Sequence, residues 1–148
     1  MNEPGISLRR FGYDDECWKV EVTASNGRFA ATFDFYTHPM ELAPFAEALL
    51  TFPRDVHDEA KFEQGAHSSE PAYHLLIRSF LYDGPGHSAI EFAVHDHPAR
   101  RFTPSAHFYV PAEAAAINRL GQKLLRWLQC ADEPLSWRAN PLPANLNS

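Results

Sequence analysis

The sequence contains few cysteines, no long apolar run and no extended cluster of basic residues. Its two cysteines, Cys17 and Cys130, stand too far apart for the spacing of a metal-binding or redox pair. We expect reduced, mostly buried thiols in a cytoplasmic protein. No apolar run approaches the length that crosses a bilayer, and the first residues lack the basic and apolar regions of a secretory signal. The sequence therefore predicts no membrane partner.

Positive charge is also scarce. The chain has 13 Lys and Arg against 19 Asp and Glu, which gives a net charge of −6 when the histidines are neutral. No basic stretch exceeds the arginine pairs at 9–10 and 100–101. Nucleic-acid-binding proteins usually carry a basic patch, so we expect no nucleic-acid partner. The acidic balance suits a basic protein partner instead.

Motifs that identify a reaction or a cofactor are missing as well. The sequence has no Gly-rich phosphate loop and no nucleophile elbow. We therefore expect no cofactor, no catalytic residues and no enzymatic activity. One chemical alternative stays open, because Cys17 could act as a nucleophile with one of the eight histidines and an acid.

The segment "CWKVEVTASNGRFAATFDFYT" predicts a β-hairpin. Asn26-Gly27 is the preferred pair for a two-residue turn in which both residues have positive φ. Such a turn places Ser25 opposite Arg28 and fixes the register of both strands. One face then carries apolar residues only, and it should face the core: Trp18, Val20, Val22, Ala24, Phe29, Ala31, Phe33 and Phe35.

Two segments change to a helical period, one after this hairpin and one near the end of the chain. The first helix is expected to begin at Pro39 and the second at Pro111, each with a glutamate in its first turn. Residues 53–70 are polar and predict a loop, while three strands are expected between 73 and 110. The predicted fold is α+β in the order βββα-βββα. An antiparallel sheet of five to six strands carries both helices on one face.

With 148 residues, the chain has room for one domain with a single core. We place that domain at 1–131 and an extended C-terminal tail at 132–148, in which Trp137 is a candidate anchor.

Histidines and other polar residues alternate with apolar residues along the three later strands. Ile90, Phe92 and Val94 should face the core, so the side chains between them should face the other way. The turns predict that Arg78 pairs with Glu91 and His74 with His95, and that His107 lies beside Glu91. The expected partner-binding residues on this face are His74, Arg78, Glu91, His95, His107 and Tyr109.

The outward face permits more than one function. Tyr and Arg are typical anchors of protein interfaces, which favours a protein partner, and Asp55, Asp58, Glu59 and Glu63 could extend the surface. A solvated face without a partner is the plain alternative. A small metal-binding protein or enzyme could use the His/Glu/Tyr cluster, but the histidines lack a closed ligand geometry, so we expect no metal. A small-ligand module with a pocket lined by Trp18, Phe33 and Phe35 is the third possibility.

Two motifs, together with the order of elements over residues 16–130, carry a likeness to a known family: "DGPGH" at 83–87 and the Phe-Tyr step into an acidic helix start at 108–113. On these features the chain resembles small bacterial immunity proteins of polymorphic toxin systems, in particular the WapI-like group and its relatives. The resemblance implies a non-enzymatic cytoplasmic protein that binds and neutralises a cognate toxin, and the acidic charge balance suits a basic toxin domain. It transfers no toxin-contact residues to this chain.

Overall fold

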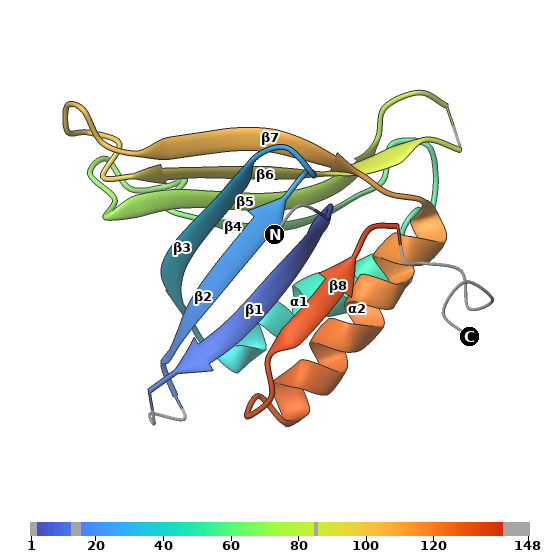
Figure 1. Ribbon diagram of the computed structural model, residues 1–148, viewed down its shortest axis with the longest axis horizontal. Helices are drawn as coiled ribbons and strands as arrows, with labels where there is room; N and C mark the ends of the chain where they lie inside the picture. Colours follow the sequence, from blue (N-terminus) through green and yellow to red (C-terminus); the bar gives the residue numbers. More distant parts are fainter. Residues whose placement is uncertain (1–2, 13–15, 85, 141–148) are drawn as a thin grey trace.

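The computed structural model describes residues 3–12, 16–84 and 86–140. In these residues, two helices and eight antiparallel strands form an α+β fold, which confirms the predicted class. The strands form two four-stranded sheets rather than the single sheet expected from the sequence (Figure 1). Sheet A has the order β3-β2-β1-β8 and contains β1 (Gly5–Phe11), β2 (Trp18–Ser25), β3 (Ala30–Thr37) and β8 (Leu135–Arg138). Sheet B has the order β4-β5-β6-β7 and contains β4 (Glu59–Gln64), β5 (Tyr73–Leu81), β6 (Ser88–Asp96) and β7 (Ser105–Pro111).

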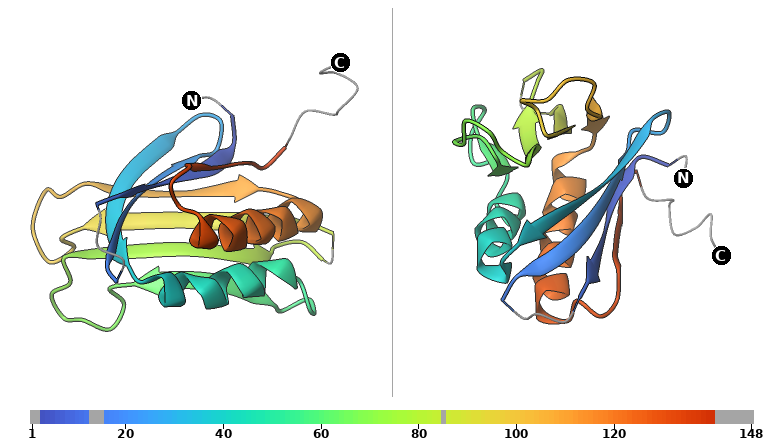
Figure 2. Two further views of the ribbon diagram at one scale, coloured as in Figure 1. Left: turned by 90° about the horizontal axis from the view of Figure 1, so that it is seen from below. Right: turned by 90° about the vertical axis from the view of Figure 1, so that its left-hand side faces the viewer.

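The helices and sheet A all lie on the same side of sheet B. Figure 2 shows α1 (Pro39–Leu50) and α2 (Ala114–Gln129) beside sheet A, with sheet B behind them all. The strands of the two sheets run at a steep angle to each other (Figure 1). No described element covers the opposite face of sheet B, which we refer to as its open side.

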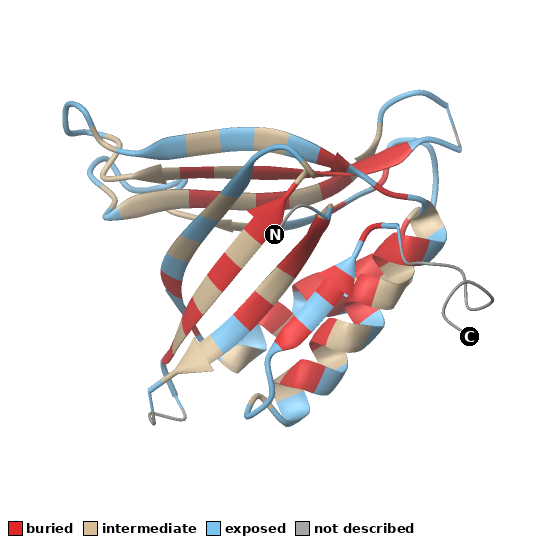
Figure 3. Ribbon diagram, in the orientation of Figure 1, coloured by how far each residue is buried: buried red, intermediate tan, exposed pale blue. Residues whose placement is uncertain are grey.

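One apolar core joins both sheets and both helices. Phe62 on β4 lies 5.7 Å from Phe35 on β3 and 5.9 Å from Phe45 on α1, measured between ring centroids. Trp18 on β2 meets Trp127 on α2 edge to face at 5.5 Å. Buried residues alternate with exposed ones along the strands (Figure 3), so each sheet turns one face toward this core.

The first helix follows its predicted start. Pro39 is the first residue of α1, and the Nδ1 atom of His38 accepts a hydrogen bond from the backbone N–H of Met40 at 3.2 Å. Leu42 and Phe45 are buried, whereas Met40 is exposed. The second helix begins later than predicted, at Ala114, because Pro111 still belongs to β7.

Two strands arise where the sequence predicted none. In the predicted loop 53–70, Ala60 and Phe62 point inward and alternate with polar residues to make β4. In the predicted tail 132–148, Leu135 and Trp137 alternate in the same way to make β8, which pairs with β1. Residues 135–138 of the predicted tail thus form a strand of sheet A, and residues 141–148 lie outside the described part. The Trp137 indole donates to the carbonyl of Ala116 at 2.8 Å, which explains how this strand is anchored.

The first hairpin has the predicted core face but a different register. Ser25 pairs with Ala30 rather than Arg28, so β3 is shifted by two residues. The side chain of Asn26 accepts hydrogen bonds from the N–H groups of Arg28 and Phe29 and favours a longer turn. A two-residue shift keeps each side chain on its face, but it moves Phe29 into the turn, where it is exposed rather than in the core.

The cysteines differ from their expected environment. Cys17 and Cys130 are both free, as expected, but both are exposed rather than buried. Cys17 precedes β2, and Cys130 follows the last residue of α2, so each stands at the end of an element instead of inside the core.

Candidate functional site

The open side of sheet B, which we call the outer face, contains every residue predicted to bind a partner. The register pairs Arg78 with Glu91 and His74 with His95, which confirms both predicted cross-strand pairs. The side chains of this face come from all four strands of sheet B: Glu59, Lys61, Glu63, His74, Leu76, Arg78, Phe80, Glu91, Ala93, His95, His107 and Tyr109.

A network of charged groups occupies the centre of the outer face. Nε of Arg78 donates to Oε1 of Glu91 at 2.8 Å, and its terminal nitrogen donates to Glu59 at 3.1 Å. Nε2 of His107 lies 2.8 Å from the other oxygen of Glu91. The predicted arrangement of an acid between two potential cations is therefore confirmed. Its register is not as predicted, because Glu91 pairs with Tyr109, and His107 reaches Glu91 along a diagonal.

The charges around Glu91 keep it ionised. Burial by itself would raise the pKa of the Glu91 carboxyl, but hydrogen bonds and positive charge from Arg78 and His107 outweigh it, and its pKa lies below the ordinary value. Burial would also lower the pKa of Arg78, and its two carboxylate partners raise it. Both groups are held in fixed positions by their partners, and neither has the shifted pKa of a general acid or base at neutral pH.

Aromatic side chains surround this network. The guanidinium of Arg78 lies 4.4 Å from the ring centroid of Phe80, and Phe80 meets Tyr109 edge to face at 5.9 Å. Tyr109 also contacts the imidazole of His107, with 5.3 Å between ring centroids. Tyr109 and Tyr82 remain exposed despite these contacts. The arrangement offers amphipathic side chains that a partner could cover.

The other histidines do not converge on a common point. His74 lies 2.8 Å from a carboxylate oxygen of Glu63, while His95 lies 3.1 Å from the hydroxyl of Thr103. His97 sits in the β6–β7 loop beside Asp96. Across the described ranges, no three histidine, cysteine or carboxylate side chains come together in a way that could hold a metal ion.

The acidic residues of the predicted loop divide between two environments. Glu59 and Glu63 extend the outer face, because β4 lies at the edge of sheet B. Asp58 instead is buried and accepts three hydrogen bonds from Arg54, which keep the pKa of its carboxyl low. Asp55 accepts a hydrogen bond from the backbone N–H of His57. The sequence could not separate these roles, because it gave no sign of β4.

No protein-family model matches the sequence, and no curated protein matches it. Two solved plant structures are similar in fold. WHY1 from Arabidopsis thaliana aligns over 86% of this chain and 80% of its own, with a TM-score of 0.48 and 11% identity. The plant transcriptional regulator PBF-2 aligns over 86% of this chain and 78% of its own, with a TM-score of 0.47 and 12% identity.

These two structures require one correction. The charge balance predicted that the chain has no nucleic-acid partner, and the likeness to a transcriptional regulator contradicts that prediction, which we withdraw. At these TM-scores the likeness supports no particular function.

Within the described residues, neither helix is both long and apolar enough to cross a bilayer.

Proposed function

We propose that this chain is a non-enzymatic binding protein whose outer face of sheet B contacts a protein partner. The observation that carries the proposal is the position of Arg78. Its guanidinium is held between Glu59 and Glu91, above Phe80 and close to the exposed Tyr109, on the face that no described element covers.

A fixed arginine lowers the entropic cost of binding. Arg side chains lose rotamer freedom when a partner immobilises them, and Arg78 is already held by two carboxylates. Tyr and Arg are also enriched among the residues that dominate binding energy. The outer face therefore offers a positioned arginine and an aromatic side chain beside it.

The partner that we propose to test first is a toxin. The order of elements resembles that of bacterial immunity proteins, and the net charge of −6 suits a basic toxin domain. The same proposal includes a cytoplasmic location, in keeping with two free cysteines.

The direct test is a double substitution, Arg78→Ala with Tyr109→Ala. We expect affinity for a basic toxin domain encoded beside this chain's gene, once such a reading frame is identified, to fall by about 100-fold or more, because loss of two interface anchors typically costs several kcal/mol. Isothermal titration calorimetry would measure the dissociation constant. Association of the native chain should also be faster at low salt, since complementary charge steers the encounter.

The matched control is Arg9→Ala with Tyr36→Ala. This pair removes the same side-chain types from exposed positions of sheet A, outside the outer face of sheet B. It should bind with native affinity. Native affinity of a folded Arg78→Ala/Tyr109→Ala variant, checked by circular dichroism, would contradict the proposal.

A further inference from the structure

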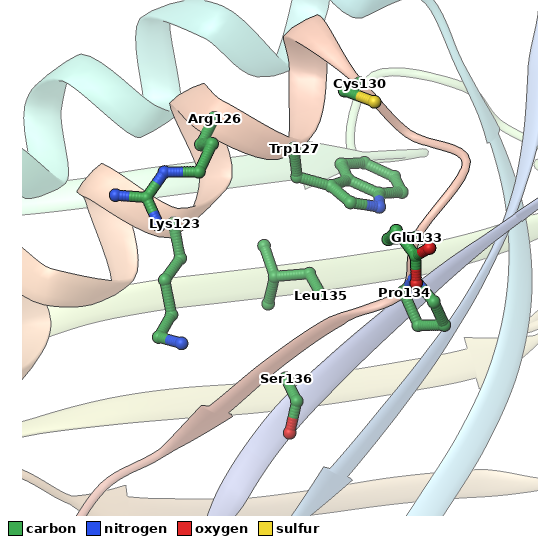
Figure 4. A pocket seen from close by; sticks show the side chains of 8 residues that line it. All are labelled: Lys123, Arg126, Trp127, Cys130, Glu133, Pro134, Leu135 and Ser136. Atoms are coloured by element: carbon green, nitrogen blue, oxygen red, sulfur yellow. The ribbon is translucent and has the colours of Figure 1, made fainter.

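A cleft of about 280 Å³ lies between the last turns of α2 and the segment that leads into β8. Figure 4 shows its lining side chains, with Lys123 and Arg126 at one end and Glu133 at the other. The ring of Trp127 and the side chains of Pro134 and Leu135 provide its apolar surface. This cleft is separate from the outer face of sheet B, since sheet A and α2 form its walls.

Two cations at this cleft lack an acidic partner. Lys123 and Arg126 are one helical turn apart on α2, and neither makes an ion pair with any carboxylate of the described residues. Two unpaired cations beside an apolar wall favour an anion that also carries an apolar group.

The wall of the cleft also contains an unsatisfied donor. Trp127 is only 4% exposed, and its indole Nε1 is buried without a hydrogen-bond acceptor among the described residues. The indole Nε1 of Trp18, which meets Trp127 edge to face, is in the same state, whereas Trp137 donates from its indole to the Ala116 carbonyl. In Figure 4 the indole nitrogen of Trp127 is on the side of its ring toward Glu133 and Pro134. Buried donors are normally paired, so this one marks a position where a bound molecule could supply an acceptor.

We propose that this cleft binds a small amphipathic anion. An aromatic or aliphatic body packs against Trp127, Pro134 and Leu135. The carboxylate or sulfonate of the same molecule lies at the end of the cleft formed by Lys123 and Arg126. The proposal concerns a second surface of the protein and stands independently of the partner-binding function of sheet B.

Two fluorescent probes that differ in one group test the proposal. 8-Anilino-1-naphthalenesulfonate is an amphipathic anion, and N-phenyl-1-naphthylamine is the same molecule without the sulfonate. We expect saturable binding of the anionic probe to the folded native chain. Lys123→Ala with Arg126→Ala should raise its dissociation constant by about tenfold or more, since two charge-assisted contacts are lost. The dissociation constant of the neutral probe should not change.

The matched control is Arg100→Ala with Arg101→Ala, which removes the same charge from an exposed loop of sheet B. It should bind both probes like the native chain. The location is checked by the indole N–H signals in a ¹H–¹⁵N spectrum. The anionic probe should shift the Trp127 signal, assigned with Trp127→Phe, and leave that of Trp137 in place. No saturable binding, equal binding by the Lys123→Ala/Arg126→Ala variant, or an unmoved Trp127 signal would each overturn the proposal.

Discussion

At the scale of single residues, Glu91 organises the outer face, and its charge should make stability depend on pH. Its pKa in the folded chain lies below the ordinary value of 4.5. The contribution of a carboxylate with a lowered pKa is therefore present above about pH 4.5 and is lost as the pH falls through the lower, folded value. We expect Glu91→Gln to reduce the free energy of unfolding by about 1 kcal/mol at pH 7, because Arg78 loses an ionic partner and the pair is partly screened by solvent.

Urea denaturation of the native chain and Glu91→Gln at a series of pH values measures this difference. The two stabilities should begin to converge as the pH falls below about 4.5 and should meet only once the pH has passed the lower, folded pKa of Glu91. Some acid sensitivity should persist in the variant, because hydrogen bonds from Arg54 and His74 also lower the pKa of Asp58 and Glu63. Glu47→Gln, an exposed change on α1, is the control. A constant difference between native and Glu91→Gln chains at every pH would show that the ionic contacts contribute nothing.

At the scale of elements, the contact between α1 and α2 depends on Gly121. A Cβ atom at this position would lie 2.8 Å from the carbonyl oxygen of Ala46 and 2.9 Å from the backbone nitrogen of Leu50. Backbone atoms cannot move aside as a flexible side chain can. Gly121→Ala should therefore lower the free energy of unfolding by about 1–3 kcal/mol through overpacking, although Ala favours helix by about 1 kcal/mol over Gly.

Urea denaturation measures this effect as well. Gln122→Ala, on the exposed side of the same helix turn, is the control and should change stability by no more than about 0.5 kcal/mol. If Gly121→Ala stabilised the chain, the helices would have to separate at little cost, and the close approach would not matter for stability.

The sequence predicted the elements that have long, regular patterns. Alternation along β5, β6 and β7 defined the outer face correctly, because successive side chains of a strand point to opposite faces whatever the exact register. Turn lengths were less certain. The predicted registers of the first hairpin and of the β6–β7 pair were each wrong by two residues. A two-residue shift keeps every side chain on its face but changes its cross-strand partner, so His107 does not pair directly with Glu91.

Short elements could not be predicted in the same way. β4 and β8 each bury only a pair of apolar side chains, Ala60 with Phe62 and Leu135 with Trp137. Their strand form depends on neighbours that are distant in sequence, since β8 pairs with β1. The cleft beside Trp127 depends on β8, which supplies part of its lining, so it could not follow from local pattern.

At the scale of the whole molecule, the shared core connects parts that are far apart in sequence. The tryptophans, Trp18, Trp127 and Trp137, belong to sheet A or to α2, and sheet B contains none. Sheet B contributes other large side chains to the same core, including the fully buried Phe92. Tryptophan fluorescence therefore reports unfolding of sheet A and α2, whereas far-UV circular dichroism reports all strands and helices.

This distribution allows a test of whether the two sheets unfold together. Phe92→Ala leaves a cavity in sheet B and should cost about 3–5 kcal/mol, which lowers the melting temperature by about 10 °C. Because one core joins the sheets, we expect the fluorescence and circular dichroism transitions to shift by the same amount and to coincide. Phe102→Ala removes an almost fully exposed phenyl ring from the β6–β7 loop and should leave both transitions in place. A fluorescence transition that stayed at its native temperature in Phe92→Ala would show that sheet A with its helix is a separate cooperative unit.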